Sequence, residues 1–499
     1  MEKSYAKLHV AFFPFMTPGH SIPMLDLVCL FIARGIKTTV FTTPMNAPNI
    51  AKYLNIKESS DCGDNDDNSS DVANIYVTPF PSKEAGLPDG IESQDSTTSP
   101  EMTLKFFVAM ELLKDPLEGF LKEVRPNCLV ADNFFPYATE VASKFGIPRF
   151  VFQFTGFFAM SVMMALNRFQ PENSVSSDEE EFVVASLPHE IKLTKSQLQQ
   201  AYEGSDGMNS AFSRLCNGAG RALFTSYGVI FNSFYELEPD YVDYYKNTMG
   251  KRSSVWHVGP VSLCNRHTEG KSLRGRTAAI SDHSCLEWLN SKQPNSVIYV
   301  CFGSLTCFTN EQLKEIATAL QRSEQNFIWV LKGEKNKEEW LSHGFEETVQ
   351  GRGLIIWGWA PQVLILDHEA IGGFVTHCGW NSTLESISAG VPMVTWPIYA
   401  EQFYNEKLVT DVLKVGVKVG SIHWSETTGG TFLSHEKIEE ALKKIMVGEN
   451  AVEMRERAKK LKDLAYKAVE KEGSSYCQLS SLINELGSVT TDKGRKYYK

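Results

Sequence analysis

Residues that could hold a charged, polar small molecule are concentrated in one segment, residues 359–402. Its middle reads HCGWNS (residues 377–382) and lies between an apolar, strand-like run and a predicted helix. The N-terminus of a helix exposes backbone N–H groups and the positive end of a dipole, which together attract anions. Gly379 permits close approach of phosphate oxygens, while His377, Asn381 and Ser382 add side-chain donors. Taken alone, the segment is equally typical of an anion site and of ordinary N-capping.

Side chains around this segment extend the possible site. Trp359 precedes an Ala-Pro pair and could stack on an aromatic base, although a core tryptophan has the same signature. Gln362 and Glu385 could bond the hydroxyls of a ribose. Glu401 and Gln402 stand at another predicted helix start, where a carboxylate and an amide suit the hydroxyls of a sugar. The segment as a whole favours a nucleotide that carries a sugar.

A second group of residues, near the N-terminus, is suited to moving a proton. Histidine, whose free side chain has a pKa of about 6.5, is the residue type best poised to act as a base near neutral pH, and His20 is the candidate. An imidazole base needs a carboxylate on its other nitrogen, and Asp132 follows a predicted strand. His20 is expected in a loop, residues 15–21, at the carboxyl edge of the same sheet. A loop histidine and a turn aspartate without catalytic roles would look the same.

Strand-like and helical patterns alternate along the chain and would position these side chains. The predicted strands are residues 8–14, 38–43, 128–131, 296–301, 326–331, 354–357 and 373–376, and the predicted helices include residues 23–34, a helix from Glu311, 382–389 and 451–486. This alternation predicts parallel sheets that are covered on both faces. Ligands of such sheets bind at the carboxyl ends of the strands, where Gly303-Ser304 also lies.

The length of 499 residues predicts two domains, because a chain of this size exceeds one hydrophobic core. Residues 251–284 are polar and rich in glycine and basic residues, as in an interdomain linker. We expect an N-terminal domain over 1–250, a C-terminal domain over 285–470, and a C-terminal helix and tail over 471–499. Whether that helix packs back on the N-terminal domain stays open. Residues 57–71 and 176–181 are expected to be acidic loops.

The composition excludes several classes of partner. A formal net charge of -11 argues against nucleic acid and against an anionic membrane, both of which require a basic face. No apolar run approaches the length of a membrane span. The 10 cysteines are scattered without a C-x-x-C pair, so neither a zinc site nor a disulfide framework is expected. Because no secretory signal is recognisable, the chain is expected to be cytoplasmic.

Together, these motifs resemble the signature of the plant family-1 UDP-glycosyltransferases. The match comprises WAPQ at 359–362, HCGWNS at 377–382 and the terminal Gln402, with P-x-x-x-x-G-H at 14–20, C-x-E-W-L at 285–289 and FGS at 302–304. The resemblance covers nearly the whole chain. It implies an α/β fold of the GT-B type, in which two Rossmann-like domains face a cleft.

The resemblance also implies a role for each motif residue. Trp359 would stack on uracil, the backbone of Ala360 would bond the edge of the base, and Gln362 and Glu385 would hold the ribose. The diphosphate would be held by Ser304, His377, Gly379, Asn381 and Ser382, and the sugar would face Trp380, Glu401 and Gln402. A terminal Gln, with Trp at position 380, accompanies glucose in the family. UDP-glucose is therefore the expected co-substrate, without a further cofactor or a metal.

The chemistry that this implies is inverting transfer of glucose to a hydroxyl of a hydrophobic plant metabolite, namely a flavonoid, another phenolic or a triterpenoid. His20 would take the proton of the acceptor, and Asp132 would stabilise the imidazolium. A wall of aromatic and methionine side chains could receive the acceptor, although ordinary core is the more common setting for most of these residues. They are Phe134, Phe135, Tyr137, Phe154, Phe157, Phe158, Met160, Met163 and Met164. The oligomeric state stays open.

Other classes of protein are disfavoured or left open by the same residues. A serine hydrolase would need a G-x-S-x-G elbow, which the chain lacks. A dinucleotide-dependent oxidoreductase is disfavoured because the G-x-G sequences at 218–220 and 351–353 lack the third glycine and the strand-to-helix context. Transfer of galactose, xylose or glucuronic acid stays open. A non-catalytic protein that binds a UDP-sugar or another small molecule also stays open.

Overall fold

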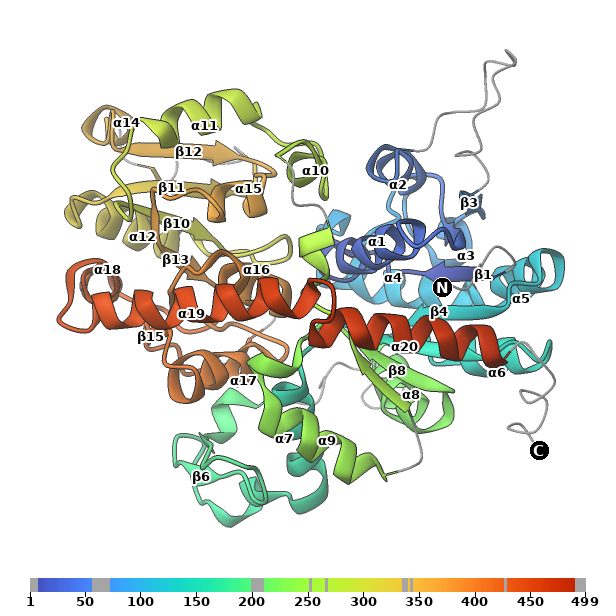
Figure 1. Cartoon of the computed structure of the whole chain (residues 1–499). Coiled ribbons are helices and arrows are strands. Elements are labelled where there is room, and N and C mark those ends of the chain that lie inside the picture. The colour runs from blue at the N-terminus through green and yellow to red at the C-terminus, as the bar shows by residue number, and fades with distance from the viewer. Residues whose placement is uncertain are drawn as a thin grey trace.

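Two parallel sheets, one in each half of the chain, dominate the computed structural model (Figure 1). The structure describes residues 8–55, 72–198, 211–250, 254–264, 268–333, 340–341, 344–425 and 429–489. The predicted acidic loop at 57–71 lies outside these ranges, and so does the tail beyond residue 489.

The N-terminal sheet is built from β1 (His9–Phe13), β2 (Lys37–Thr42), β3 (Ala73–Val77), β4 (Cys128–Asp132), β5 (Arg149–Gln153), β8 (Gly228–Phe231) and β9 (Ser254–His257). The C-terminal sheet is built from β10 (Val297–Cys301), β11 (Asn326–Leu331), β12 (Gly353–Trp357), β13 (Ile371–Thr376), β14 (Met393–Thr395) and β15 (Gly416–Lys418). A small antiparallel pair, β6 (Phe182–Val183) and β7 (Lys192–Leu193), stands apart from both sheets.

Helices lie between the strands and cover both faces of each sheet. The first half holds α1 (Pro18–Ile32), α2 (Ala47–Tyr53), α3 (Ser82–Ala85), α4 (Pro100–Leu112), α5 (Lys114–Val124), α6 (Tyr137–Ser143), α7 (Phe157–Phe169), α8 (Ala211–Thr225) and α9 (Pro239–Met249). The second half holds α10 (Thr268–Ser272), α11 (Asp282–Asn290), α12 (Asn310–Arg322), α14 (Phe345–Thr348), α15 (Gln362–Leu366), α16 (Trp380–Ala389), α17 (Gln402–Lys407), α18 (His435–Val447), α19 (Ala451–Val469) and α20 (Ser474–Val489). Because both faces are covered, β4 and β13 are buried along their whole length.

The order of the strands shows where each sheet can bind a ligand. It is β3-β2-β1-β4-β5-β8-β9 in the first sheet and β12-β11-β10-β13-β14-β15 in the second. The chain therefore changes its direction of progress between β1 and β4, and again between β10 and β13. In doubly wound sheets, a crevice opens at this switch point outside the carboxyl ends of the strands.

The start of α1 differs from the prediction in a way that concerns the site. We expected a loop over residues 15–21, but the helix begins at Pro18, so His20 lies in its first turn. Proline suits this position because its missing N–H would have no partner in the first turn and its φ already fits a helix. The imidazole is consequently held by a helix rather than by a loop.

Two further differences concern the ends of the domains. Residues 254–257, within the predicted linker, form β9 and extend the first sheet by pairing with β8, and Trp256 is buried there. The predicted helix at 451–486 is two helices, because the chain turns at 470–473, where Glu472 has a φ of 72°. After this turn, α20 crosses to the N-terminal domain, as Figure 1 shows.

The C-terminal helix α20 belongs to the core of the first domain. Leu479, Leu482 and Ile483 are buried in one apolar cluster with residues of β1 and α1. Arg34 also donates a hydrogen bond to Ser480 over 3.1 Å. The last helix therefore ties the second domain back onto the first. Within the described ranges, every helix is too short or too polar to span a membrane.

Candidate active site

A cavity of about 920 Å³ lies between the two domains, at the carboxyl edges of both sheets. The cavity is lined by every donor-site residue that the sequence suggested, namely Ser304, Trp359, Ala360, Gln362, His377, Gly379, Trp380, Asn381, Ser382, Glu385, Glu401 and Gln402. His20 lines the same cavity from the opposite domain. The switch points of the two sheets thus face each other across one space.

His20 and Asp132 form a hydrogen-bonded pair at the switch point of the first sheet. His20 Nδ1 lies 3.0 Å from Asp132 Oδ2, and Asp132 Oδ1 accepts a hydrogen bond of 2.9 Å from the backbone N–H of Phe134. The Asp132 side chain is fully buried, whereas that of His20 is 14% exposed. The carboxylate therefore fixes the imidazole from behind and leaves Nε2 for a molecule in the cavity.

The turn between β13 and α16 directs the first turn of this helix at the cavity. Cys378 takes a φ of 64° there, and Asn405 Nδ2 donates a hydrogen bond of 2.9 Å to its carbonyl oxygen. The ring of His377 lies between two glycines: a Cβ at Gly303 would be 2.7 Å from its Cε1, and one at Gly379 would be 2.5 Å from its Nε2. Only glycine at both positions leaves room for this ring beside the helix terminus.

Burial lowers the pKa of His377 to about 4, so the ring is neutral near pH 7. It can then offer a phosphate one N–H donor but no positive charge. The positive potential of this side of the cavity comes instead from the backbone N–H groups of α16. This side of the cavity thus offers dipoles rather than a fixed cation to an anion.

The residues expected to hold the ribose form a hydrogen-bonded cluster. Gln362 Nε2 donates to Glu385 Oε2 over 2.8 Å and to Ser382 Oγ over 3.0 Å. Glu385 Oε1 also accepts from Arg274 Nη1 over 2.5 Å. The sequence reasoning missed Arg274, because a basic residue in a polar linker carries no motif that separates it from a solvated side chain.

The residues expected near the sugar, and Asn381 of the expected diphosphate site, lie where the two domains meet. Trp380 Nε1 donates a hydrogen bond of 2.8 Å to the carbonyl oxygen of Asn232, and Asn381 Nδ2 donates one of 2.5 Å to the carbonyl oxygen of Gly19. Gln402 Oε1 accepts two backbone N–H bonds, from residues 398 and 399. Burial raises the pKa of Glu401. Each side chain is thus oriented by the protein itself.

The proposed acceptor wall is only partly correct. Phe134, Phe154, Met160, Met163 and Met164 line the cavity. Phe135, Phe157 and Phe158 are fully buried in apolar clusters, and the Tyr137 hydroxyl donates to the carbonyl oxygen of Met110 over 2.8 Å. The sequence could not separate the two groups because aromatic residues mark core and pocket alike. Further apolar lining comes from Phe15, Phe107, Phe212, Leu223, Phe224 and Met249.

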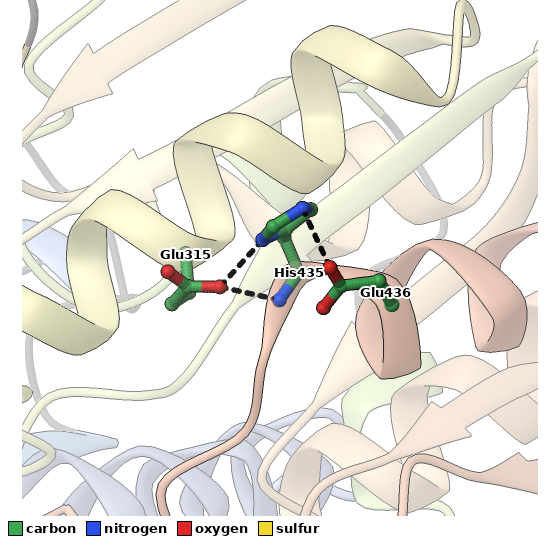
Figure 2. A group of neighbouring side chains, drawn as sticks. All are labelled: Glu315, His435 and Glu436. Atoms are coloured by element: carbon green, nitrogen blue, oxygen red, sulfur yellow. Dashed lines mark hydrogen bonds and ion pairs between the residues drawn. The ribbon is translucent and has the colours of Figure 1, made fainter.

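One cluster in the described residues brings together three side chains that could hold a metal ion, but it lies outside the cavity. Figure 2 shows Glu315 of α12 beside His435 and Glu436 at the start of α18. His435 Nδ1 lies 2.8 Å from Glu315 Oε2, and its Nε2 lies 3.1 Å from Glu436 Oε1. Both ring nitrogens therefore already have carboxylate partners, and the cluster ties the two helices together.

Known proteins are similar to this chain over most of its length. A family model described as UDP-glucoronosyl and UDP-glucosyl transferase matches residues 272–461. UDP-glucosyl transferase 73M2 of Saponaria officinalis is 80% identical over 488 residues, which are 97% of this chain and 98% of that protein. Scopoletin glucosyltransferase of Nicotiana tabacum is 48% identical over 485 residues, or 97% of this chain and 99% of that protein.

The fold agrees with a solved structure of the same kind. Glycyrrhiza uralensis UGT73P12, complexed with glycyrrhetinic acid 3-O-monoglucuronide, matches with a TM-score of 0.87 and 38% identity over 98% of both chains. Two Rossmann-like domains that face one cleft define a glycosyltransferase of the GT-B fold, as predicted. More narrowly, the chain belongs to the plant family-1 UDP-glycosyltransferases, and the protein is an enzyme of that family.

Proposed function

We propose that this enzyme transfers glucose from UDP-glucose to a hydroxyl of a hydrophobic plant metabolite, with inversion at the anomeric carbon. The observation that carries the proposal is the His20–Asp132 pair, which faces the first turn of α16 across a single cavity. Glucose is favoured as the sugar because the names of two similar proteins state glucosyl transfer.

The geometry supports a direct displacement. His20 Nε2 takes the proton of the acceptor hydroxyl, and Asp132 stabilises the resulting imidazolium. The acceptor oxygen forms a bond to the anomeric carbon while the bond from that carbon to the phosphate oxygen breaks. The electron pair leaves with UDP, towards the N–H groups of α16. The helix terminus and the neutral His377 stabilise the charge that develops there.

We further propose that the reaction needs no cofactor beyond the UDP-sugar. The support is the donor set itself: Ser304, His377, Asn381 and Ser382 line the expected diphosphate position together with the terminus of α16. Dialysis against a chelator tests this proposal. Turnover should survive it, and loss of turnover that Mg²⁺ or Mn²⁺ restores would contradict it.

The apolar lining suits a bulky, flat acceptor. Its aromatic rings and methionine side chains offer a wide, adaptable contact surface for a phenolic or a triterpenoid. Two similar proteins are consistent with this range: one is named for scopoletin, and the other is complexed with a triterpenoid glucuronide.

The decisive experiment is UDP release from UDP-glucose with phenolic, flavonoid and triterpenoid acceptors, with wild type beside His20→Ala. We expect release that depends on the acceptor, and a loss of about 10²–10⁴-fold in the variant because the general base is gone. UDP affinity should stay unchanged. Equal turnover by both proteins would refute the role of His20. Release of UDP only from UDP-galactose, UDP-xylose or UDP-glucuronic acid would show that the transferred sugar is not glucose. Tight UDP binding without any turnover would favour a binding protein.

A further inference from the structure

Two buried amide side chains on the acceptor side of the cavity have oxygens without a hydrogen-bond partner. Asn133 and Gln153 line the cavity and are only 7% and 1% exposed. Within the described ranges, no protein donor reaches Asn133 Oδ1 or Gln153 Oε1. The amide nitrogen of Gln153 lies 2.9 Å from the sulfur of Met160. Native proteins pair nearly all buried polar groups, so two such oxygens in one cavity indicate a ligand that donates hydrogen bonds.

The two amides lie next to the base. The register of β4 and β5 pairs Asp132 with Phe152. Asn133 and Gln153 directly follow these two residues, so they are adjacent at the carboxyl ends of the two neighbouring strands. The residues that follow them, Phe134 and Phe154, stack with ring centroids 5.4 Å apart. Their rings lie 5.4 Å and 4.2 Å from that of His20. The amides therefore adjoin the part of the cavity where the acceptor hydroxyl must meet Nε2.

The polarity of the site selects a neutral donor over an anion. An amide oxygen accepts a hydrogen bond from O–H or N–H but repels a carboxylate. The cations that line the cavity on the linker are already paired: Lys271 with Asp367, Arg274 with Asp26 and Glu385, and Arg276 with Asp95. A hydroxyl is thus the group that best matches the two oxygens.

We propose that Asn133 and Gln153 bind a second hydroxyl of the acceptor, next to the hydroxyl that His20 deprotonates. This inference rests on the proposed function. It narrows the preferred acceptors to hydrophobic molecules with two neighbouring hydroxyls, such as a catechol or a vicinal diol. Asn133 and Gln153 are specificity-determining residues in this proposal, because they touch the acceptor without taking part in the transfer of its proton.

Matched acceptor pairs test this role. Esculetin carries a free hydroxyl where scopoletin carries a methoxy group, and quercetin has one hydroxyl more than kaempferol. For wild type, we expect kcat/KM to be about tenfold to a hundredfold higher for the richer member of a pair, because the poorer member leaves the buried amides unpaired. Gln153→Met and Asn133→Leu each remove the amide and keep an apolar side chain. The preference should shrink in each variant and approach unity in the double variant.

Further variants separate recognition from structure. Gln153→Glu retains accepting oxygens and should retain the preference. Gln312→Met is the matched control, since Gln312 lies in the C-terminal domain and is a buried amide whose two ends both bond the backbone of Leu433. It should lower the thermal midpoint and leave the preference unchanged. The KM for UDP-glucose should not change in the Asn133 or Gln153 variants.

The outcomes distinguish the two proposals. A preference that survives in a folded double variant would overturn the role of the amides while leaving glucosyl transfer intact. An equal loss of kcat/KM for both members of each pair would assign the amides a purely structural role and would also overturn it. If wild type transferred glucose to no acceptor at all, both the proposed function and this inference would be refuted.

Discussion

His20 and His377 face each other across the cleft, but their surroundings give them different chemistry. His20 has a buried carboxylate partner and a partly exposed ring, as a base requires. His377 is enclosed between two glycines, and burial lowers its pKa to about 4. In the proposed function, the same residue type therefore acts as a proton acceptor on one side and as a neutral hydrogen-bond donor on the other. This difference arises from the environment of each ring rather than from the side chain itself.

The lowered pKa of His377 predicts a pH dependence of stability. Its pKa is about 4 in the folded protein against 6.5 for the free side chain. As the pH falls through this window, the unfolded chain binds a proton that the folded chain does not, so folding stability is lost. His377 can account for up to about 3 kcal/mol of that loss. Urea unfolding at several pH values should show a smaller acid-induced loss for His377→Gln than for wild type.

An exposed histidine provides the control for this measurement. His283 is 88% exposed, so His283→Gln should reproduce the pH dependence of wild type. If His377→Gln and wild type lost the same stability between pH 6.5 and about 4, the neutral state of His377 would be disproved. Burial also lowers the pKa values of His9 and His257 to about 4, so part of the loss should persist in the variant.

At the scale of elements, the turn from β13 into α16 is the unit on which the proposed donor site depends most. The helix terminus supplies N–H groups, and the loop after β10 approaches it through Gly303. Gly303 has a φ of 75°, which is unfavourable for any side chain, and its hydrogen faces the His377 ring. Two loops from neighbouring strands therefore build one surface, and glycine lets them meet.

Gly303→Ala should weaken donor binding. A Cβ there would lie 2.7 Å from the His377 ring, so the ring must move away from the diphosphate position. We expect the Kd for UDP to rise about tenfold or more, which corresponds to the loss of roughly one charge-assisted hydrogen bond. Isothermal titration with UDP measures this change directly.

Gly35→Ala is the matched control for Gly303→Ala. Gly35 has a similar φ of 69°, but a Cβ there would meet nothing within 4 Å, so this variant carries the backbone strain alone. It should lose stability and bind UDP as wild type does. Equal UDP affinity of Gly303→Ala and wild type would show that the position of the His377 ring does not matter for the diphosphate.

At the scale of the whole molecule, a buried ion cluster joins the two domains through the linker. Arg274 makes a bond of 2.9 Å to Asp26 of α1 and one of 2.5 Å to Glu385 of α16. Tyr53 also donates to Asp26. Burial raises the pKa of Asp26, and Arg274 opposes that rise. The carboxylate expected to hold the ribose is thereby connected to the opposite domain.

Removal of Arg274 should destabilise the closed arrangement. Arg274→Met leaves two buried carboxylates with no cation between them, and breaking a buried pair in this way costs about 3–5 kcal/mol. Urea unfolding should show this loss, and the affinity for UDP should fall as Glu385 loses its support. Arg214→Met, which breaks an exposed pair with Glu111, should cost at most about 1 kcal/mol. Similar unfolding of both variants would refute a special role for the cluster.

Much of the enzyme follows from the sequence alone, for local reasons. β11 has the bounds that its apolar run predicts, and the α/β alternation gives both parallel sheets. The motifs at 359–362 and 377–382 point to the UDP-sugar because each is contiguous: the spacing of its residues along the chain already sets their geometry. His20 and Asp132 were proposed because each follows a predicted strand, at the edge where α/β sheets bind ligands, and because the family resemblance implies this pair.

The tertiary structure decided what depends on contacts between distant segments. Arg274 meets Asp26 and Glu385 across separations of 248 and 111 residues, and no local pattern marks such a partnership. The split of the aromatic wall into core and pocket, the return of α20 to the first domain, and the unpaired oxygens of Asn133 and Gln153 likewise depend on packing between segments. A sequence records which groups are available, but only the folded chain determines which of them are buried together.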